Sequence, residues 1–111
     1  MTDELTFRKN ADHAIESLKK SLIIAEEGGD FDVEEQNGVL NVVFEEPPGK
    51  FVITPNTPVR QIWISALSTS FKLDWSETAN DFVLAKDGTG LKPLVARLIS
   101  THLGQEVSLL G

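Results

Sequence analysis

Carboxylate side chains occur at two places in this sequence where their spacing would bring several oxygen atoms onto one surface. On a helical wheel, Asp12, Glu16 and Glu27 lie roughly opposite an apolar stripe and within about 60° of one another. In residues 30–34 acidic and apolar residues alternate, so the acids would share one face of a strand. Carboxylates without histidine or cysteine suit weak, exchangeable binding of hard or borderline cations. The predicted metal-binding residues are Asp12, Glu16, Glu27, Asp30, Asp32 and Glu34.

Two other interpretations of these acids were weighed. The spacing from Asp30 onward resembles a calcium loop, but the turn glycine and the closing glutamate of an EF-hand are missing, which excludes that class. On the helical stretch the acidic side also carries Lys20 and Ile23, and Lys20 can pair with Glu16 at the i,i+4 spacing. A solvated acidic surface that keeps the protein soluble remains the alternative to a cation site.

A second candidate site lies in the alternating segment 60–65. Ile62 and Ile64 would point into a core, whereas Gln61 and Trp63 would lie on the opposite face of the strand. If that face is covered, Trp63 is a core residue. If it is open, a large aromatic side chain flanked by hydrogen-bonding groups is typical of the anchor of a protein interface.

Motifs for catalysis are missing from the sequence. Without cysteine there is no disulfide, thiolate metal site or cysteine nucleophile. No nucleophile constellation or phosphate-binding glycine loop is present, and residues 88–90 predict a turn before a helix. His13 is expected to be solvated, and His102 to interact with the C-terminal end of a helix. We therefore expect a protein that is not an enzyme.

The charge distribution restricts the class of partner. Of 17 acids and 10 bases, residues 1–46 hold 12 acids and four bases, and residues 47–111 hold five acids and six bases. This asymmetry argues against nucleic acid or an anionic membrane as the main partner, and favours a cationic protein surface or metal cations. No apolar run is long enough to span a membrane, and the acidic N-terminus lacks the features of a signal peptide, so we expect a soluble protein.

The positions of apolar residues predict the elements that carry these side chains. Apolar residues on one stripe predict an amphipathic helix over residues 3–26, and a second helix is predicted over residues 91–102. Between them, alternation and turn dipeptides such as Asn37-Gly38 predict short strands. The predicted strands cover residues 30–35, 39–44, 50–54, 61–65, 71–75 and 81–85. Residues 107–110 form an apolar tail that should pack back onto the other elements.

These elements predict an α+β fold. Short turns make the sheet antiparallel, because parallel neighbours would need crossover connections. We expect a two-layer α/β sandwich in one domain, residues 1–111, with a sheet of about five to six strands and the N- and C-terminal helices on one face. The other face would then be partly open, and Trp63 exposed on it.

Several segments, in order along nearly the whole chain, resemble the frataxin family, including its bacterial CyaY-type members. The most specific is the run from Thr57-Pro58 to Gln61-Ile62-Trp63-Ile64-Ser65. The others are Ala11-Asp12, Asp30-Phe31-Asp32-Val33, Asn37-Gly38-Val39-Leu40, Phe51-Val52-Ile53, Lys72-Leu73-Asp74-Trp75, Asp87-Gly88 and the leucine pattern of the last helix. The family fold is the sandwich predicted above.

The resemblance implies an iron-binding regulator or adaptor of iron–sulfur cluster assembly, which docks on the cysteine desulfurase–scaffold complex and delivers or senses Fe(II). It implies weak, surface-exposed binding of Fe2+ or Fe3+ by the six acids, with Glu26 and His13 as neighbours. The same acids would meet a basic patch on the desulfurase. The scaffold-contacting residues implied by the resemblance are Asn56, Gln61, Trp63 and Lys72.

The resemblance leaves two alternatives open, a metal-independent interaction module of the same machinery and an iron-storing or iron-oxidising protein. It implies a monomer that could oligomerise with iron, in the bacterial cytosol, or in the mitochondrial matrix if the source is eukaryotic. Lys19 and Lys20 stand where relatives usually carry acidic or neutral residues, and Ile23-Ile24 where carboxylates are common. These departures should lower the affinity for cations.

Overall fold

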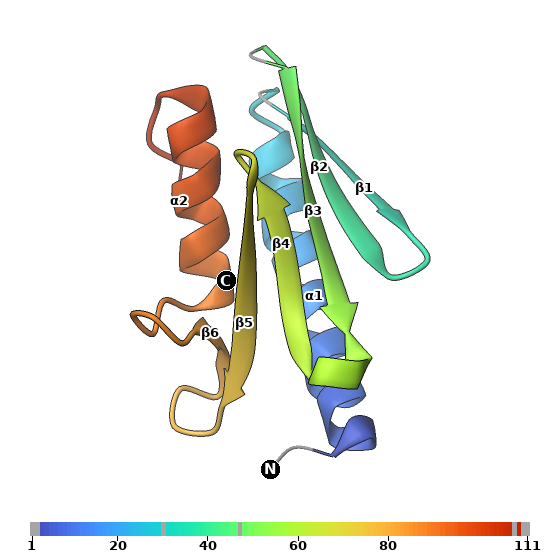
Figure 1. Ribbon diagram of the computed structural model, residues 1–111. Helices are drawn as coiled ribbons and strands as arrows, with labels where there is room; N and C mark the ends of the chain where they lie inside the picture. The colour runs from blue at the N-terminus through green and yellow to red at the C-terminus, as the bar shows by residue number, and fades with distance from the viewer. Residues whose placement is uncertain (1–2, 30, 47, 108, 110–111) are drawn as a thin grey trace.

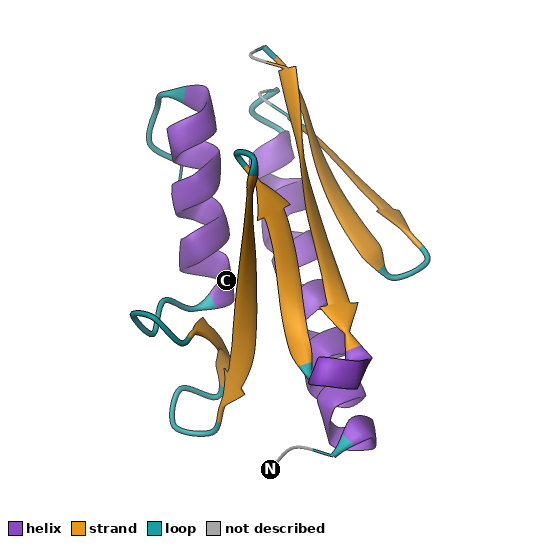
Figure 2. Cartoon of the chain, viewed as in Figure 1, coloured by secondary structure: helices purple, strands orange, loops and turns teal. Residues whose placement is uncertain are grey.

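A layer of helices and a layer of strands make up the fold, in a computed structural model that describes residues 3–29, 31–46, 48–107 and 109 (Figures 1 and 2). The described elements are α1 (Glu4–Glu26), β1 (Asp32–Gln36), β2 (Val39–Glu45), β3 (Pro48–Asn56), the short 3-10 helix η1 (Thr57–Val59), β4 (Gln61–Ala66), β5 (Thr69–Ser76), β6 (Asp81–Leu84) and α2 (Leu91–Leu103).

Helix α1 begins at an N-cap and buries one face. The Asp3 carboxylate accepts the backbone N–H of Thr6 at 2.7 Å, which satisfies one of the free N–H groups of the first turn. The apolar stripe predicted from the sequence is buried, and the helix ends before Gly28 and Gly29, where Gly29 adopts a φ of +82°. The buried residues of the stripe are Phe7, Ala11, Ile15, Leu18 and Leu22.

The six described strands form one antiparallel sheet in the order β1-β2-β3-β4-β5-β6. Each strand therefore pairs with its neighbours in the chain, as the short turns predict. Asn37 and Gly38 both have positive φ angles, of 54° and 80°, which suits the tight β1–β2 hairpin. In β4, Ile62 and Ile64 are fully buried, and Trp63 between them lies on the other face of the sheet.

Strand β3 continues further than predicted. The predicted strand ends at residue 54, but β3 runs on to Asn56, and Pro55 lies opposite Ile62 of β4. The register with β2 ends at the Leu40–Ile53 pair, so beyond Ile53 this strand has a neighbour on one side only. Proline is tolerated there because its missing N–H is not needed at an edge.

Both helices pack on the same face of the sheet, which confirms the predicted fold class. Figure 1 shows α1 behind the central strands and α2 on the side of β5 and β6, while the opposite face of the sheet carries no helix. Phe7 of α1 meets Phe82 of β6 edge to face, with ring centroids 5.8 Å apart. No helix in the described ranges is long and apolar enough to cross a membrane.

Two details at the end of the chain complete the core. His102 lies in the last turn of α2, as predicted. Its ring also packs against Phe44 of the sheet, with centroids 4.2 Å apart. Val107 and Leu109 of the predicted tail pack against the core, and Val107 donates its N–H to Ser100 Oγ at 2.8 Å. The tail residues 108 and 110 lie outside the described residues.

Candidate functional site

The open face of the sheet carries a connected group of polar and aromatic side chains on β4 and β5. Trp63 lies opposite Lys72 in the strand register, and Gln61 lies opposite Asp74. The Trp63 indole Nε1 donates to Gln61 Oε1 at 2.8 Å, and Gln61 Nε2 donates to Asp74 Oδ1 at 3.0 Å. Lys72 Nζ lies 4.9 Å from the centroid of the Trp63 ring, within the range of a cation–π contact. We call Gln61, Trp63, Lys72 and Asp74 the open-face cluster.

The position of Trp63 follows from strand alternation. Because Ile62 and Ile64 are fully buried beneath the helices, Trp63 points to the face that the helices leave uncovered. Its side chain is half-buried rather than fully exposed. The Gln61 bond and the Lys72 ammonium hold the ring in one orientation on the sheet surface.

The remaining predicted contact residue lies at the border of this cluster. Asn56, the last residue of β3, is opposite Gln61 in the register and half-buried. Asp74, which completes the hydrogen-bond chain, was not among the contact residues predicted from the sequence. Its alternation with Lys72 along β5 is the signal that could have identified it.

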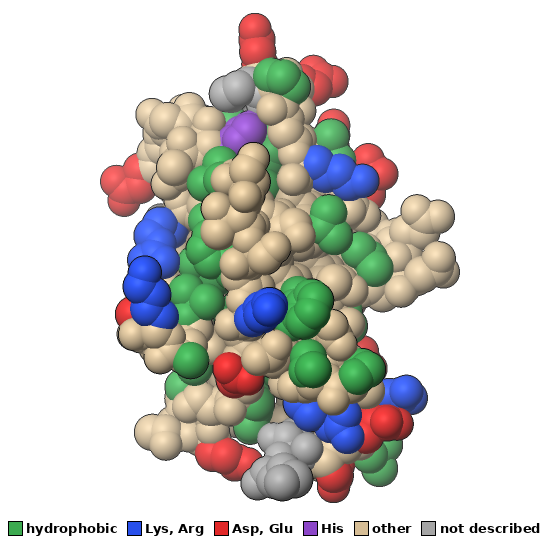
Figure 3. Space-filling model, in the orientation of Figure 1, with side chains coloured by type: hydrophobic (Ala, Val, Ile, Leu, Met, Phe, Trp, Pro, Cys, Tyr) green, Lys and Arg blue, Asp and Glu red, His purple; other side chains and the backbone are tan. Residues whose placement is uncertain are grey.

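Figure 3 views the molecule on this open face. Uncharged side chains occupy most of its middle, and hydrophobic side chains lie beside a positive and a negative one over β4 and β5. Most acidic side chains visible in this view lie towards its rim. Few charges in the middle of a face and more charges at its rim are a distribution also found at protein interfaces.

The predicted metal-binding acids are distributed over two sides of the fold. Asp12 and Glu16 are exposed on α1, one turn apart, whereas Glu27 follows the last residue of that helix. With a rise of about 1.5 Å per residue, Glu27 lies on the order of 20 Å along the helix from Asp12. Asp32 and Glu34 are exposed on β1, opposite Val43 and Asn41.

Strand alternation explains this separation. Phe31 is buried and Val33 packs against the core, so Asp32 and Glu34 point to the open face of the sheet, away from α1. Asp30 lies outside the described residues. Among the residues that are described, no three His, Asp or Glu side chains come together in a group that could hold a metal ion.

The structure brings one unpredicted acid to the helix side of the sheet. Glu35 of β1 accepts a hydrogen bond from Lys19 Nζ at 2.8 Å, with both side chains about one-third exposed. This hydrogen bond, and then the charge of Glu35, raise the pKa of Lys19 above its ordinary value. Glu35 also lines a shallow groove of about 230 Å³ together with Asp12 and Glu16.

The same ion pair corrects one sequence-based interpretation. In the described part of the chain, Lys20 does not pair with Glu16 along the helix, and instead Lys19 reaches across to β1. Alternation within residues 31–35 places Glu35 on the side facing α1, and this pattern could have predicted the contact.

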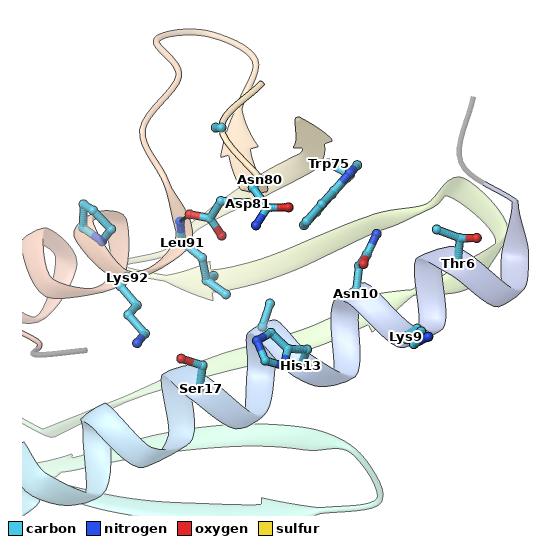
Figure 4. Close-up of a pocket in the computed structure, with 13 residues that line it drawn as sticks. Thr6, Lys9, Asn10, His13, Ser17, Trp75, Asn80, Asp81, Leu91 and Lys92 are labelled. Carbon is cyan, nitrogen blue, oxygen red and sulfur yellow. Dashed lines mark hydrogen bonds between the residues drawn. The ribbon is translucent and has the colours of Figure 1, made fainter. Parts of the chain in front are cut away.

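Two possible neighbours of the acids have other surroundings. Glu26 accepts the backbone N–H of Val33 at 2.6 Å, so it joins the end of α1 to β1. His13 lines a cleft between α1, the β5–β6 turn and the start of α2, which the sequence did not predict (Figure 4).

Comparison with known proteins assigns the chain to a family. A family model described as a frataxin-like domain matches residues 1–105. The iron-sulfur cluster assembly protein CyaY of Azotobacter vinelandii is 30% identical over 95 residues, covering 84% of this chain and 86% of that protein. The protein of the same name from a Janthinobacterium species is 25% identical over 108 residues, covering 96% of this chain and 95% of that protein.

A solved structure shares the fold. The frataxin from Psychromonas ingrahamii superposes with a TM-score of 0.81 at 19% sequence identity, covering 99% of this chain and 100% of that one. At this level of identity the likeness concerns the fold, the two-layer arrangement described above.

Proposed function

Since the chain belongs to the frataxin-like family, we propose that it acts in iron–sulfur cluster assembly as a regulator or adaptor. In this proposal it docks on the cysteine desulfurase–scaffold complex and delivers or senses Fe(II) as cargo. The name of the CyaY relatives supports the assembly role. Those relatives are bacterial, and we propose that this chain is located in the bacterial cytosol.

The observation that carries the docking proposal is the open-face cluster. A half-buried tryptophan, fixed by a hydrogen bond to Gln61 and stacked with Lys72, is already ordered before a partner arrives. Ordering side chains on binding costs free energy, so a preorganised aromatic anchor binds more tightly than a mobile one. Asn56 and Asp74 add amide and carboxylate groups around the anchor, as at the rim of an interface hot spot.

The acidic residues of α1 and β1 serve a second contact in this proposal. Asp12, Glu16 and Glu27 follow α1 on its exposed side, and such a row of carboxylates attracts a basic patch on a partner. Fe(II) would bind to one or two of these carboxylates with water completing its coordination, which suits weak and exchangeable binding. Asp32 and Glu34, on the other face, would form a separate weak position.

A metal-independent docking module is the second candidate. It is favoured by the absence, within the described ranges, of any three metal-ligating side chains in one group. In that case the same acids contribute only to partner binding.

The substitution Trp63→Ala tests the docking proposal. We expect it to abolish the modulation of cysteine desulfurase activity, because it removes the aromatic anchor and leaves Gln61 without its donor. The free energy of unfolding should fall by only about 1 kcal/mol, as the ring is half-buried on the sheet surface. Desulfurase turnover with the scaffold present, and thermal unfolding of the variant, are the measurements.

The control is Trp63→Phe, which keeps an aromatic ring but removes the hydrogen bond to Gln61. It should retain part of the modulation. If Trp63→Ala unfolds the domain, Trp63 is a structural residue. If the variant folds and still modulates the enzyme fully, docking does not use this face.

A further inference from the structure

A cleft of about 840 Å³ lies between α1, the turn joining β5 to β6, and the first turn of α2 (Figure 4). Its volume falls within the range of about 300–1,000 Å³ typical of small-molecule sites. Because it involves the helix layer, it is separate from the open-face cluster on the other side of the sheet. The proposed docking function therefore leaves this cleft unused.

The charge of the cleft is opposite to that of the whole chain. The protein has a net charge of -7, but Lys9, Lys92 and His13 line the cleft against a single carboxylate, Asp81. In the part of the chain that the structure describes, neither lysine forms an ion pair with an acid. Two unpaired ammonium groups beside a histidine attract an anion, and most strongly one with a phosphate group.

The single Asp81 carboxylate balances only one of the two lysines that line the cleft, and backbone N–H groups hold it in place. Its Oδ1 accepts the N–H of Phe82 at 2.8 Å, and its Oδ2 accepts the N–H of Leu91 at 3.4 Å. The second contact also occupies the start of α2, and Pro93 in the same turn has no N–H to offer. The Asp81 carboxylate at the start of α2 repels an anion from the helix N-terminus, so the lysine side chains are the better donors to an anion.

The other end of the cleft is suited to a planar ring. The half-buried Trp75 packs on Phe82, with centroids 5.2 Å apart, and also lines the cleft. Figure 4 shows the carboxamides of Asn10 and Asn80 near Trp75, whereas Lys92 extends towards Ser17 and His13. An indole beside two carboxamides offers a stacking surface together with donors and acceptors for the edge of a heterocycle.

From these two ends we propose that the cleft binds a nucleoside phosphate, with its base beside Trp75 and its phosphate between His13 and Lys92. The carboxamides contact the base edge, the Lys92 ammonium offsets charge on the phosphate, and a His13 ring N–H donates a hydrogen bond to it. This inference is independent of the proposed assembly function, since it uses none of the residues of the open-face cluster.

Nuclear magnetic resonance titration of the isotopically labelled protein with AMP tests the proposal. We expect the Trp75 indole and the Asn10 and Asn80 carboxamide signals to shift, while the Trp63 indole on the opposite face stays unchanged. Adenosine and ribose phosphate, which each retain one half of the ligand, should bind more weakly than AMP. No shift at about 10 mM AMP, a concentration that would saturate a millimolar site, would overturn the proposal.

Inorganic phosphate separates a nucleotide site from a simple anion site. If inorganic phosphate binds the cleft with the same affinity as AMP and displaces it, the cleft recognises only an anion and the proposal is wrong. The same conclusion follows if AMP shifts the lysine and histidine signals alone and leaves Trp75 unchanged.

Two matched variants test the phosphate end. Lys92→Gln should weaken AMP binding about fivefold, as expected for the loss of one partly exposed charged contact, and leave adenosine binding unchanged. Lys50→Gln makes the same charge change at an exposed lysine of β3, outside the residues that line the cleft. It should leave both affinities unchanged. If both variants weaken AMP binding equally, the effect is due to net charge, which contradicts the proposed contact.

Discussion

The Lys19–Glu35 ion pair engages one of the carboxylates that lie near α1. Glu35 lines the same shallow groove as Asp12 and Glu16, but its charge is matched by Lys19 at 2.8 Å. Lys20, the next residue, is exposed and does not line this groove. The two neighbouring lysines therefore provide a matched pair of substitutions.

We predict that Lys19→Gln increases the affinity for Fe(II) about two- to fivefold, because it frees the Glu35 carboxylate and removes a nearby positive charge. Lys20→Gln makes the same change in net charge and should increase the affinity less. The measurement is paramagnetic broadening of the signals of Asp12, Glu16 and Glu35 during anaerobic titration with Fe(II). An equal increase in the two variants would show that only net charge matters.

Alternation along a strand made part of the site predictable at the residue scale. It correctly separated Ile62 and Ile64 from Trp63, and it predicted the outward positions of Asp32 and Glu34. The six acids were predicted as one set of metal-binding residues. Whether a residue of β1 points towards α1 or away from it, however, depends on how the helix packs on the sheet. The hydrogen-bond chain to Asp74 also required the register between β4 and β5, which depends on the exact position of the turn that joins them.

At the scale of elements, the N-cap of α1 couples the stability of this helix to pH. The Asp3 carboxylate accepts the backbone N–H of Thr6, and this hydrogen bond holds the pKa of Asp3 below its ordinary value of 3.8. A group whose pKa is lowered by folding stabilises the fold above its unfolded pKa and loses this effect as the pH falls through the folded pKa.

We therefore predict that Asp3→Ala lowers the thermal midpoint at neutral pH, and that its difference from the parent protein narrows below about pH 3.8 as Asp3 of the parent is protonated. Asp3→Asn retains an oxygen acceptor without an ionisable group, and should remain near the parent at neutral pH. Thermal unfolding at several pH values between neutral and about pH 3 gives the comparison. A deficit of Asp3→Ala that stays constant into acid would contradict the role of the carboxylate charge.

The elements themselves were predictable because each has a local signal. The apolar stripe defined α1, and turn residues such as Asn37-Gly38 separated the strands. The continuation of β3 through Pro55 was not predictable, since it depends on where the pairing with β2 ends. The packing of His102 on Phe44 is likewise a tertiary contact. A side chain at Gly49 of β3 would displace the His102 ring, because a Cβ there would lie 2.5 Å from His102 Cε1.

At the scale of the whole molecule, the two layers present different surfaces. The uncovered face of the sheet carries the open-face cluster, whereas the helix layer carries the carboxylates of α1 and the positively charged cleft near α2. The sequence predicted the two layers and the uncovered face from the order of the elements. It did not predict the cleft, because the cleft depends on the spacing between α1, the β5–β6 turn and α2.

The most direct test of the docking claim is to map the surface of the labelled protein that the cysteine desulfurase–scaffold complex covers. Signals of Gln61, Lys72 and the Trp63 indole should lose intensity on binding, while the Trp75 indole, on the helix side of the sheet, remains unaffected. The signals of Asp12 and Glu16 should lose less intensity on binding, and this loss should decrease with added salt. Loss of intensity on α1 alone, with the Trp63 indole unchanged, would contradict the claim that this protein docks through the open face of its sheet.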